Sequence, residues 1–283
     1  MIEDFLRRQA DKYSKASVDK TWVVLKQVFE YGQDEGIMSR SLSFRKIERP
    51  KEKDVAVKKK EIQCIDLKDM EPLYKECYKT YSNGKLFYGN AAKLIVFIMY
   101  SGARLGEATA LKWKYVSDDM SSIRIRQSLS RIVDRDKSGK VLYAENGTIK
   151  HKTVEKTPKT ESGERTVPLP GRAVEILKFF SDLYPDHKPD DYVFLSGTGK
   201  PYQARNVEHT LERMLKNGDC ACKEYTPHSL RHGYGSVLIS KGIDIKTVSK
   251  LLGHKDISTT YNIYIHVLEE DKIKAIKSVF DEK

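Results

Sequence analysis

Apolar residues recur along this chain at spacings of three and four, the period of a helix that buries one face. In residues 16–31 the apolar positions that share one side are Val18, Trp22, Leu25, Val28 and Phe29. The same pattern predicts further helices at residues 67–80, 90–112, 171–184, 204–216, 228–240, 244–251 and 256–265.

Between these helical stretches the period changes to two. Residues 123–126 read Ile-Arg-Ile-Arg, an alternation typical of a half-buried strand. Further short strands are predicted at 130–134, 149–157 and 165–169. The predicted fold class is therefore mainly α with a small antiparallel β-sheet (α+β).

One stretch interrupts the periodic pattern near the N-terminus. Residues 45–61, RKIERPKEKDVAVKKKE, hold a proline and many charges, which indicates an interdomain linker. This predicts a helical region at 1–48, a basic linker at 49–63 and a larger domain at 64–283. An apolar face within 268–280 predicts a helix in the tail of that domain.

The charge balance indicates a polyanionic partner. The 283 residues include 51 Lys and Arg against 40 Asp and Glu, a net charge of +11. A membrane partner is not expected, because the apolar runs are far shorter than the roughly 18 residues that a spanning helix needs. The acidic start of the chain also differs from a secretory signal.

The cysteines predict neither a metal site nor a disulfide framework. Cys64, Cys77, Cys220 and Cys222 lack the paired spacing with histidines that a zinc site shows, and free thiols fit a reducing cytoplasm. We therefore expect no metal and no cofactor.

Three separated motifs, at residues 100–111, 226–236 and 252–267, carry side chains suited to phosphodiester chemistry, and the third holds His254 and two tyrosines. A metal-free catalyst needs fixed cations on the non-bridging oxygens, and the planar guanidinium of arginine matches two such oxygens. Arg104 follows an apolar run and a glycine turn, which places it at the mouth of a helix. His228 and Arg231 lie one helical turn apart and can reach one anion.

Each motif also has a purely structural interpretation. A lone arginine after a helix is usually a surface group. Thr226 and Pro227 suit the start of a helix, and Gly253 with His254 suits a helix end. Glu107, one turn after Arg104, is expected to brace that arginine or a histidine rather than to act as an acid.

Taken together, the motifs resemble the tyrosine recombinase (phage integrase) family. The resemblance covers roughly residues 85 to 270 and rests on SGARLGE around Arg104, His228-x-x-Arg231, LGH ending at His254, and a tyrosine followed by Ile-His-Val. Integrases of conjugative transposons and phages are the most similar members. Of two nearby tyrosines, Tyr261 and Tyr264, the resemblance selects Tyr264 as the nucleophile.

The resemblance also implies a proton donor and a reaction. Lys159, in a hairpin predicted over residues 157–169, matches the lysine that protonates the leaving oxygen. Tyr264 would become linked to a 3′-phosphate, and strands would then be exchanged without metal or nucleotide. Arg104 and Arg231 would clamp the phosphate, His228 would assist proton transfer, and His254 would bond a phosphate oxygen.

The implied partners follow from this reaction. They are double-stranded DNA at attachment sites, three further copies in a homotetramer, and an excisionase or DNA-bending accessory protein, all at the bacterial nucleoid in the cytoplasm. The region at 1–48 is short for the helical core-binding domain of this family, so we expect a partial one with weak DNA affinity. The tail at 268–280 is expected to dock either on its own domain or on a neighbouring subunit.

Other functions remain open at this point. A type IB-like topoisomerase would use the same residues to relax supercoils without exchanging partners. A noncatalytic DNA-binding protein could retain the fold, although the complete set of motifs argues against a loss of catalytic residues. A basic RNA-binding protein has little support, because no aromatic-rich recognition motif is present.

Overall fold

The computed structural model of the chain describes residues 1–38, 47–58, 63–157 and 163–265. These residues form two compact units, Met1–Ile62 and Gln63–Lys283. No helix among the described residues is long and apolar enough to span a lipid bilayer.

The first unit is a pair of helices closed by the segment that follows them. Apolar side chains of both helices pack around Val55, and Ala56 donates its backbone N–H to the carbonyl of Ala10 at 2.9 Å. Part of the stretch expected to be a linker thus belongs to this unit. Its elements are α1 (Ile2–Ala10), α2 (Lys15–Asp34) and the short 3₁₀ helix η2 (Glu52–Asp54).

The apolar face expected on α2 is buried only along its first half. Val18 and Trp22 are buried, because α1 and Val55 pack against them. Val28, expected on the same face, is 61% exposed. The helix itself was correctly predicted, whereas α1 was missed.

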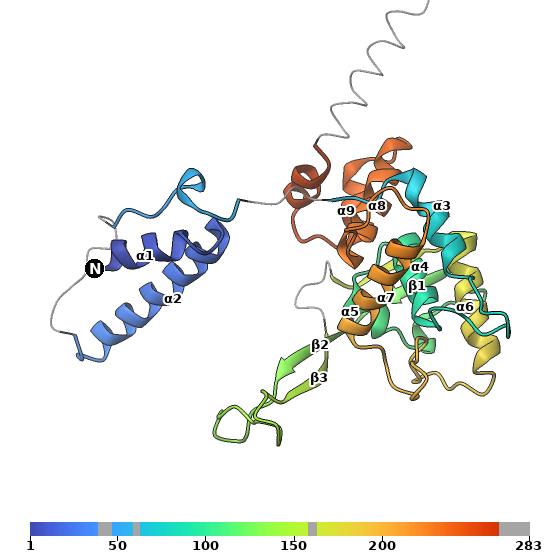
Figure 1. Cartoon of the computed structure of the whole chain (residues 1–283), viewed down its shortest axis with the longest axis horizontal. Coiled ribbons are helices and arrows are strands. Elements are labelled where there is room, and N and C mark those ends of the chain that lie inside the picture. The colour runs from blue at the N-terminus through green and yellow to red at the C-terminus, as the bar shows by residue number, and fades with distance from the viewer. Residues whose placement is uncertain (39–46, 59–62, 158–162, 266–283) are drawn as a thin grey trace, which may run out of the picture. The chain divides into compact units, whose positions relative to one another are not determined.

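The second unit is mainly helical, which confirms the predicted fold class (Figure 1). Its helices are α3 (Leu67–Glu76), α4 (Ala91–Ser101), α5 (Leu105–Thr109), α6 (Gly171–Leu183), α7 (Ala204–Asn217), α8 (Pro227–Ser240) and α9 (Ile245–Leu252), with a 3₁₀ turn η3 (Trp113–Tyr115) and helical residues 257–265. Its strands are β1 (Ser122–Ile125), β2 (Ser128–Val133), β3 (His151–Lys156) and β4 (Arg165–Pro168).

Helix α4 forms the centre of this unit. Its apolar residues from Leu94 to Met99 are fully buried, and α6, α7 and α8 pack around it. A helix without a polar face can be stable in water only in such a position. The carboxyl end of α4 is therefore fixed inside the domain, and that end leads directly to Arg104.

The helix predicted over residues 90–112 is not continuous, because the glycine turn predicted before Arg104 divides it. The chain forms two helices, α4 and α5, because Gly102 adopts a left-handed conformation with φ of 63° and ends α4. Glycine adopts this conformation without steric cost. A Cβ atom at this position would also lie 2.4 Å from the ring of Tyr234.

The strands pair as two antiparallel ladders. β1 pairs with β4, in a register that places Ile125 opposite Arg165, and β2 pairs with β3. The second strand of the hairpin predicted over residues 157–169 is β4, which pairs with β1, whereas β3 before it pairs with β2. Residues 158–162 lie outside the described residues, so this hairpin stays a prediction. β2 and β3 instead form a two-stranded arm whose tip spans residues 134–150 (Figure 1).

Candidate active site

The turn between α4 and α5 holds Arg104 at the first position before a helix. Arg104 donates its backbone N–H to the Glu107 carboxylate at 2.8 Å, which satisfies a donor that the helix leaves unpaired. Its guanidinium turns back to the same carboxylate, with 2.6 Å between Nη1 and Oε1. The position predicted for Arg104 is thus the one observed.

The start of α8 positions His228 and Arg231. Thr226 accepts the backbone N–H of Ser229 at 3.2 Å, and Pro227 occupies the first turn. The capping interpretation and the functional one hold together, because the cap fixes the helix that carries both side chains. Arg231 points inward and is 2% exposed.

Glu107 is a buried carboxylate shared by three arginines. Besides Arg104, it accepts from Arg165 at 2.8 Å and 3.2 Å, and Arg231 lies 3.8 Å away. Burial alone would raise the pKa of Glu107, but the hydrogen bonds and charge of Arg165, with the charges of Arg231 and Arg104, lower it to about 2. The expected bracing role of Glu107 is therefore observed, on more partners than expected.

The same three arginines also bind the carboxyl end of α9. Arg165 Nε donates to the carbonyl of Leu251 at 2.6 Å, and Arg104 Nη2 donates to that of Gly253 at 3.1 Å. Arg231 donates to the carbonyl of Leu252, between these two, and to that of Gly102 at 2.8 Å. Carbonyls at a helix end lack intrahelical partners and carry partial negative charge, so the guanidinium groups are attracted to them.

An open cavity adjoins this cluster. It has a volume of about 400 Å³, and Arg104 and Gly253 line it together with Gln127, Lys156 and Lys255. The Arg104 side chain is 36% exposed, whereas the Arg165 side chain is 6% exposed. Arg104 is therefore the guanidinium of the cluster that an incoming anion meets first.

Three histidines near the cluster have lowered pKa values. Burial lowers the pKa of His254 to about 4, helped by the charges of Arg231 and Arg104, and its Nδ1 lies 2.8 Å from the hydroxyl of Thr260. Burial, then the charges of Arg231 and Arg104, lower the pKa of His228. His232, which the motifs did not single out, has a pKa lowered to about 4 by burial and by His228. All three are neutral at neutral pH.

Tyr264 is buried against α8 and does not bond the arginines. Its hydroxyl has no hydrogen-bond partner among the described residues, and a Cβ atom on Gly235 would lie 2.2 Å from it. Burial raises the pKa of this phenol, and the charge of Arg231 opposes that rise. Tyr261, the other candidate, is 42% exposed. The site therefore brings Arg104, His228, Arg231 and His254 together, with Tyr264 packed against the helix that carries two of them.

A comparison with known protein families identifies the family of the domain that carries this cluster. Residues 63–271 match the phage integrase family. The chain belongs to that family. The match covers the whole cluster and both candidate tyrosines, so the resemblance inferred from the motifs is confirmed.

Relatives within the integrase family include recombinases and transposases. The chain is 28% identical, over 270 residues, to a tyrosine recombinase XerC-like protein of Caldanaerobacter subterraneus, a match that covers 91% of the chain and 64% of that protein. It is 27% identical over 224 residues to transposase A of transposon Tn554 from Staphylococcus aureus, covering 76% of the chain and 52% of the transposase. The chain thus spans less than two thirds of these curated relatives.

Solved structures of the family share the fold. The Tn1549 transposon integrase in complex with circular intermediate DNA superposes with a TM-score of 0.70 at 18% identity, over 93% of this chain and 79% of that one. The XerH recombinase bound to palindromic difH substrate superposes with a TM-score of 0.66 at 19% identity, over 100% and 72%.

One predicted site residue cannot be placed. Lys159 lies outside the described residues, so its role stays a prediction. Lys156, at the end of β3, lines the cavity beside Arg104 and shows that the chain leaves this strand next to the cluster.

Arg165 was missed by sequence reasoning. A signal was present, because Arg165 shares its strand face with the fully buried Val167. An arginine on the inward face of a strand needs a buried anionic or carbonyl partner. No group of three or more His, Cys, Asp or Glu that could hold a metal ion is found in the described part of the chain.

The depressed histidines predict how stability depends on pH. The pKa of His232 and that of His254 fall from 6.5 to about 4 on folding, so the unfolded chain binds more protons between these values. The free energy of unfolding should therefore fall as the pH is lowered from 6.5 to 4, and Glu107 should extend the loss below 4.5. Thermal unfolding midpoints measured from neutral pH to pH 4 should drop less in His232→Leu than in the wild type, and equal drops would contradict this origin.

Proposed function

We propose that this chain is a site-specific DNA recombinase that cuts and rejoins strands through a 3′-phosphotyrosine intermediate, integrating or excising a mobile element. The observation that carries the proposal is the cluster of Arg104, Arg165 and Arg231 on the ionised carboxylate of Glu107. His228 lies one turn before Arg231, and His254 follows Gly253, whose carbonyl Arg104 binds. Three guanidinium cations against one carboxylate leave a positive site, which suits a phosphate that gains charge in its transition state.

The chemistry follows from the side chains. Tyr264 Oη attacks the phosphorus and passes its proton to the neutral imidazole of His228; the bond to the 3′-phosphate forms as the bond to the 5′-oxygen breaks, and that oxygen leaves with a proton from Lys159. Attack requires the phenol to leave its contact with Gly235, and residues 257–265 carry it. His254, neutral and fixed through Thr260, is suited to donate a hydrogen bond to a phosphate oxygen.

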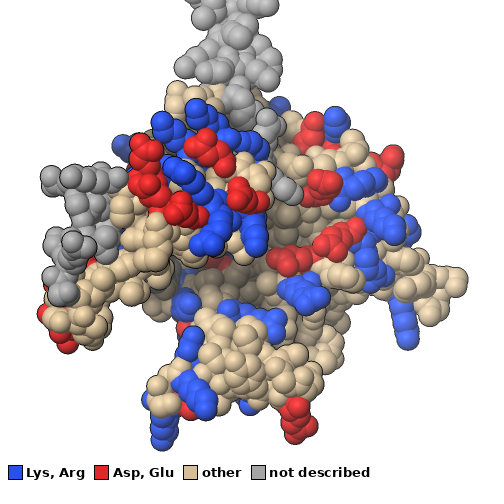
Figure 2. Space-filling view, turned by 60° about the vertical axis from the view of Figure 1, so that its left-hand side comes forward, with Lys and Arg blue, Asp and Glu red and all other residues tan. Residues whose placement is uncertain are grey.

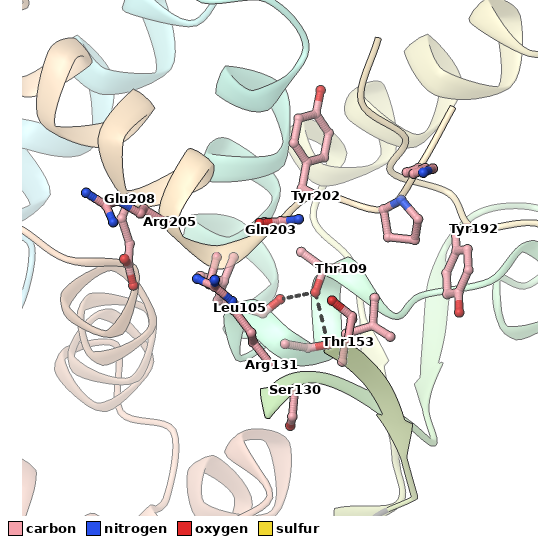
Figure 3. Close-up of a pocket in the computed structure, with 15 residues that line it drawn as sticks. Leu105, Thr109, Ser130, Arg131, Thr153, Tyr192, Tyr202, Gln203, Arg205 and Glu208 are labelled. Atoms are coloured by element: carbon pink, nitrogen blue, oxygen red, sulfur yellow. Dashed lines mark hydrogen bonds between the residues drawn. The ribbon is translucent and has the colours of Figure 1, made fainter. Parts of the chain in front are cut away.

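A second cavity offers a path for the DNA beyond the cleavage site. It has a volume of about 610 Å³, lies between α5, the arm and the start of α7, and shares Ser130 with the cavity beside Arg104. Arg131 of the arm and Arg205 at the start of α7 are among the residues that line it, together with Thr109 and Thr153 (Figure 3). We expect both arginines to bind backbone phosphates.

This role of Arg205 predicts a loss of DNA affinity. Lys, Arg, Asp and Glu are interspersed on the face shown in Figure 2, so affinity should depend on particular cations rather than on one uniform basic surface. Arg205→Ala should weaken binding to any duplex and lower the slope of log K against log salt by about 1. Titrations at several salt concentrations test this, with Arg172→Ala as the control because Arg172 pairs with Glu71 instead. An unchanged slope would remove Arg205 from the interface.

The proposed function is tested most directly by trapping its covalent intermediate. The protein is mixed with nicked duplexes made from the DNA that flanks its gene, and adducts are resolved on a denaturing gel. An adduct is expected in the presence of EDTA, because the proposed mechanism uses no metal. A protein that binds these duplexes but never forms an adduct would be a noncatalytic relative, and supercoil relaxation without strand exchange would indicate a topoisomerase.

The remaining parts of the proposal concern assembly. Strand exchange between two duplexes needs four tyrosines, so we propose a homotetramer on DNA, assisted by an excisionase or a DNA-bending protein and acting at the bacterial nucleoid. Residues 1–48 would act as a partial core-binding region and 64–283 as the catalytic domain, joined through 49–63. The tail at 268–280 lies outside the described residues. A truncated chain without this tail tests whether it docks in cis or in trans, and the measurement is the assembly state of that chain.

A further inference from the structure

We infer that Arg165 is a positioning residue of the proposed reaction: it occupies the carboxylate of Glu107 and thereby keeps the guanidinium of Arg104 available to the scissile phosphate. This inference rests on the proposed function and adds a residue outside the motifs that suggested it. Arg165 itself does not line the cavity beside Arg104.

The contacts of Glu107 divide unequally between the arginines. Arg165 binds both carboxylate oxygens, Oε2 at 2.8 Å and Oε1 at 3.2 Å. The guanidinium of Arg104 makes one contact with this carboxylate, from Nη1 to Oε1 at 2.6 Å, while its Nη2 bonds the carbonyl of Gly253 and its backbone N–H donates to Oε2. A two-point pair with a carboxylate is stronger and more directional than a single contact. The two-point guanidinium pair with Glu107 is therefore made by Arg165, and the guanidinium of Arg104 keeps donors free for a phosphate.

Arg165 is fixed from three sides. Its backbone pairs with Ile125 across the β1–β4 ladder, its Nε binds the carbonyl of Leu251, and its head binds Glu107. Gly253 completes the enclosure, since a Cβ atom there would lie 2.7 Å from Arg165 Nη1. A side chain bound in this way cannot move toward a substrate, but it fixes the groups that do.

The charge of the cluster depends on Arg165. Arg104, Arg165 and Arg231 against Glu107 leave two net positive charges, which match the two negative charges of a pentavalent phosphorus. Without Arg165 only one remains, and the buried carboxylate then pairs with Arg104 and Arg231, the groups needed for the phosphate. If the charge of Glu107 is removed as well, Arg104 and Arg231 again leave two net positive charges. The effect of Arg165 should therefore depend on whether Glu107 is charged.

A double-mutant cycle tests this dependence. The variants are Arg165→Met, Glu107→Gln and the two combined, with Arg124→Met as the control because Arg124 makes a surface pair with Glu164. Two readouts are used: the rise in thermal midpoint caused by inorganic phosphate at constant ionic strength, and the rate of adduct formation. Arg165→Met should lose the phosphate effect and react about 10²-fold more slowly, as expected when a reacting group is misplaced by about 1 Å.

The combined variant separates the inference from a merely structural role. We expect it to regain phosphate binding and at least about tenfold in rate over Arg165→Met, because the competing carboxylate charge is gone. A structural role alone predicts a combined variant no better than Arg165→Met, and that result overturns the inference. If Arg165→Met does not fold, Arg165→Lys replaces it: this variant keeps the charge but loses the two-point pair, so it should bind phosphate and react slowly, and wild-type rates would overturn the inference.

The phosphate readout keeps the two proposals distinguishable. Phosphate binding that is lost in Arg165→Met and regained in the combined variant supports the inference even if no DNA gives an adduct, in which case only the proposed function fails. Phosphate binding that is equal in all variants overturns the inference, whatever the adduct assay gives.

Discussion

Tyr264→Phe is expected to abolish the covalent adduct, with a loss of roughly 10⁴-fold or more, as for other enzymes that lose their nucleophile. The fold should not suffer, because the ring keeps its packing against Gly235. The hydroxyl that is removed is buried and has no hydrogen-bond partner in the part of the chain that the structure describes, so the thermal midpoint should stay equal or rise. Lost activity in a protein of equal or greater stability is the result that identifies a functional group.

Tyr261→Phe is the matched control for this experiment. The two tyrosines lie three residues apart in the same helical stretch, but Tyr261 is exposed, so its loss should leave adduct formation near the wild-type rate. The opposite pattern, with an adduct that survives Tyr264→Phe and disappears in Tyr261→Phe, would transfer the nucleophile to Tyr261 and overturn the assignment made from the motif.

Arg104→Ala should slow adduct formation by roughly two to three orders of magnitude, the usual cost of losing one fixed donor to a transition-state oxyanion. Arg104 is the most exposed guanidinium of the cluster and faces the cavity, so its loss should affect the rate far more than the stability. Arg104→Lys should recover part of the rate, since an ammonium supplies charge but not two-point geometry. Single-turnover rates on a nicked duplex provide the measurement.

The control for Arg104 is Arg124→Ala, which removes a surface arginine of the same domain. If both variants slow the reaction equally, the effect arises from net charge and DNA affinity rather than from the cluster. If Arg104→Ala reacts at the wild-type rate, the convergence of side chains around Glu107 is not the site of chemistry.

The sequence predicted most helices of the second unit because each carries its own local signal. Apolar spacing indicated α6, α7, α8 and α9 to within about one residue at either end. The prediction failed where local and tertiary requirements differ. The stretch predicted as helical over residues 90–112 has the apolar spacing of one helix, although the glycine turn predicted before Arg104 divides it at Gly102. The pairing of β4 with β1 was not predicted, because Ile125 and Arg165, which face each other in that ladder, lie 40 residues apart in the chain.

The candidate site was only partly readable from the chain. His228 and Arg231 follow from their spacing on a helix, and Arg104 follows from its turn. The bonds of Arg165 could not be predicted in the same way, because Glu107 and Leu251 lie 58 and 86 residues away from it. The burial of Tyr264 likewise depends on its contact with Gly235. These two residues lie in different segments, and no sequence pattern links the segments.

The bonds from Arg165, Arg231 and Arg104 to the carbonyls of Leu251, Leu252 and Gly253 have a consequence for how this protein tolerates change. Three guanidinium groups from distant parts of the chain are thus positioned by three consecutive backbone carbonyls. Inserting or deleting a single residue inside α9 would rotate that run by about 100° and misalign all three at once. The loop before α9 makes none of these bonds, so we expect a change of length there to disturb the three arginines less than one inside the helix.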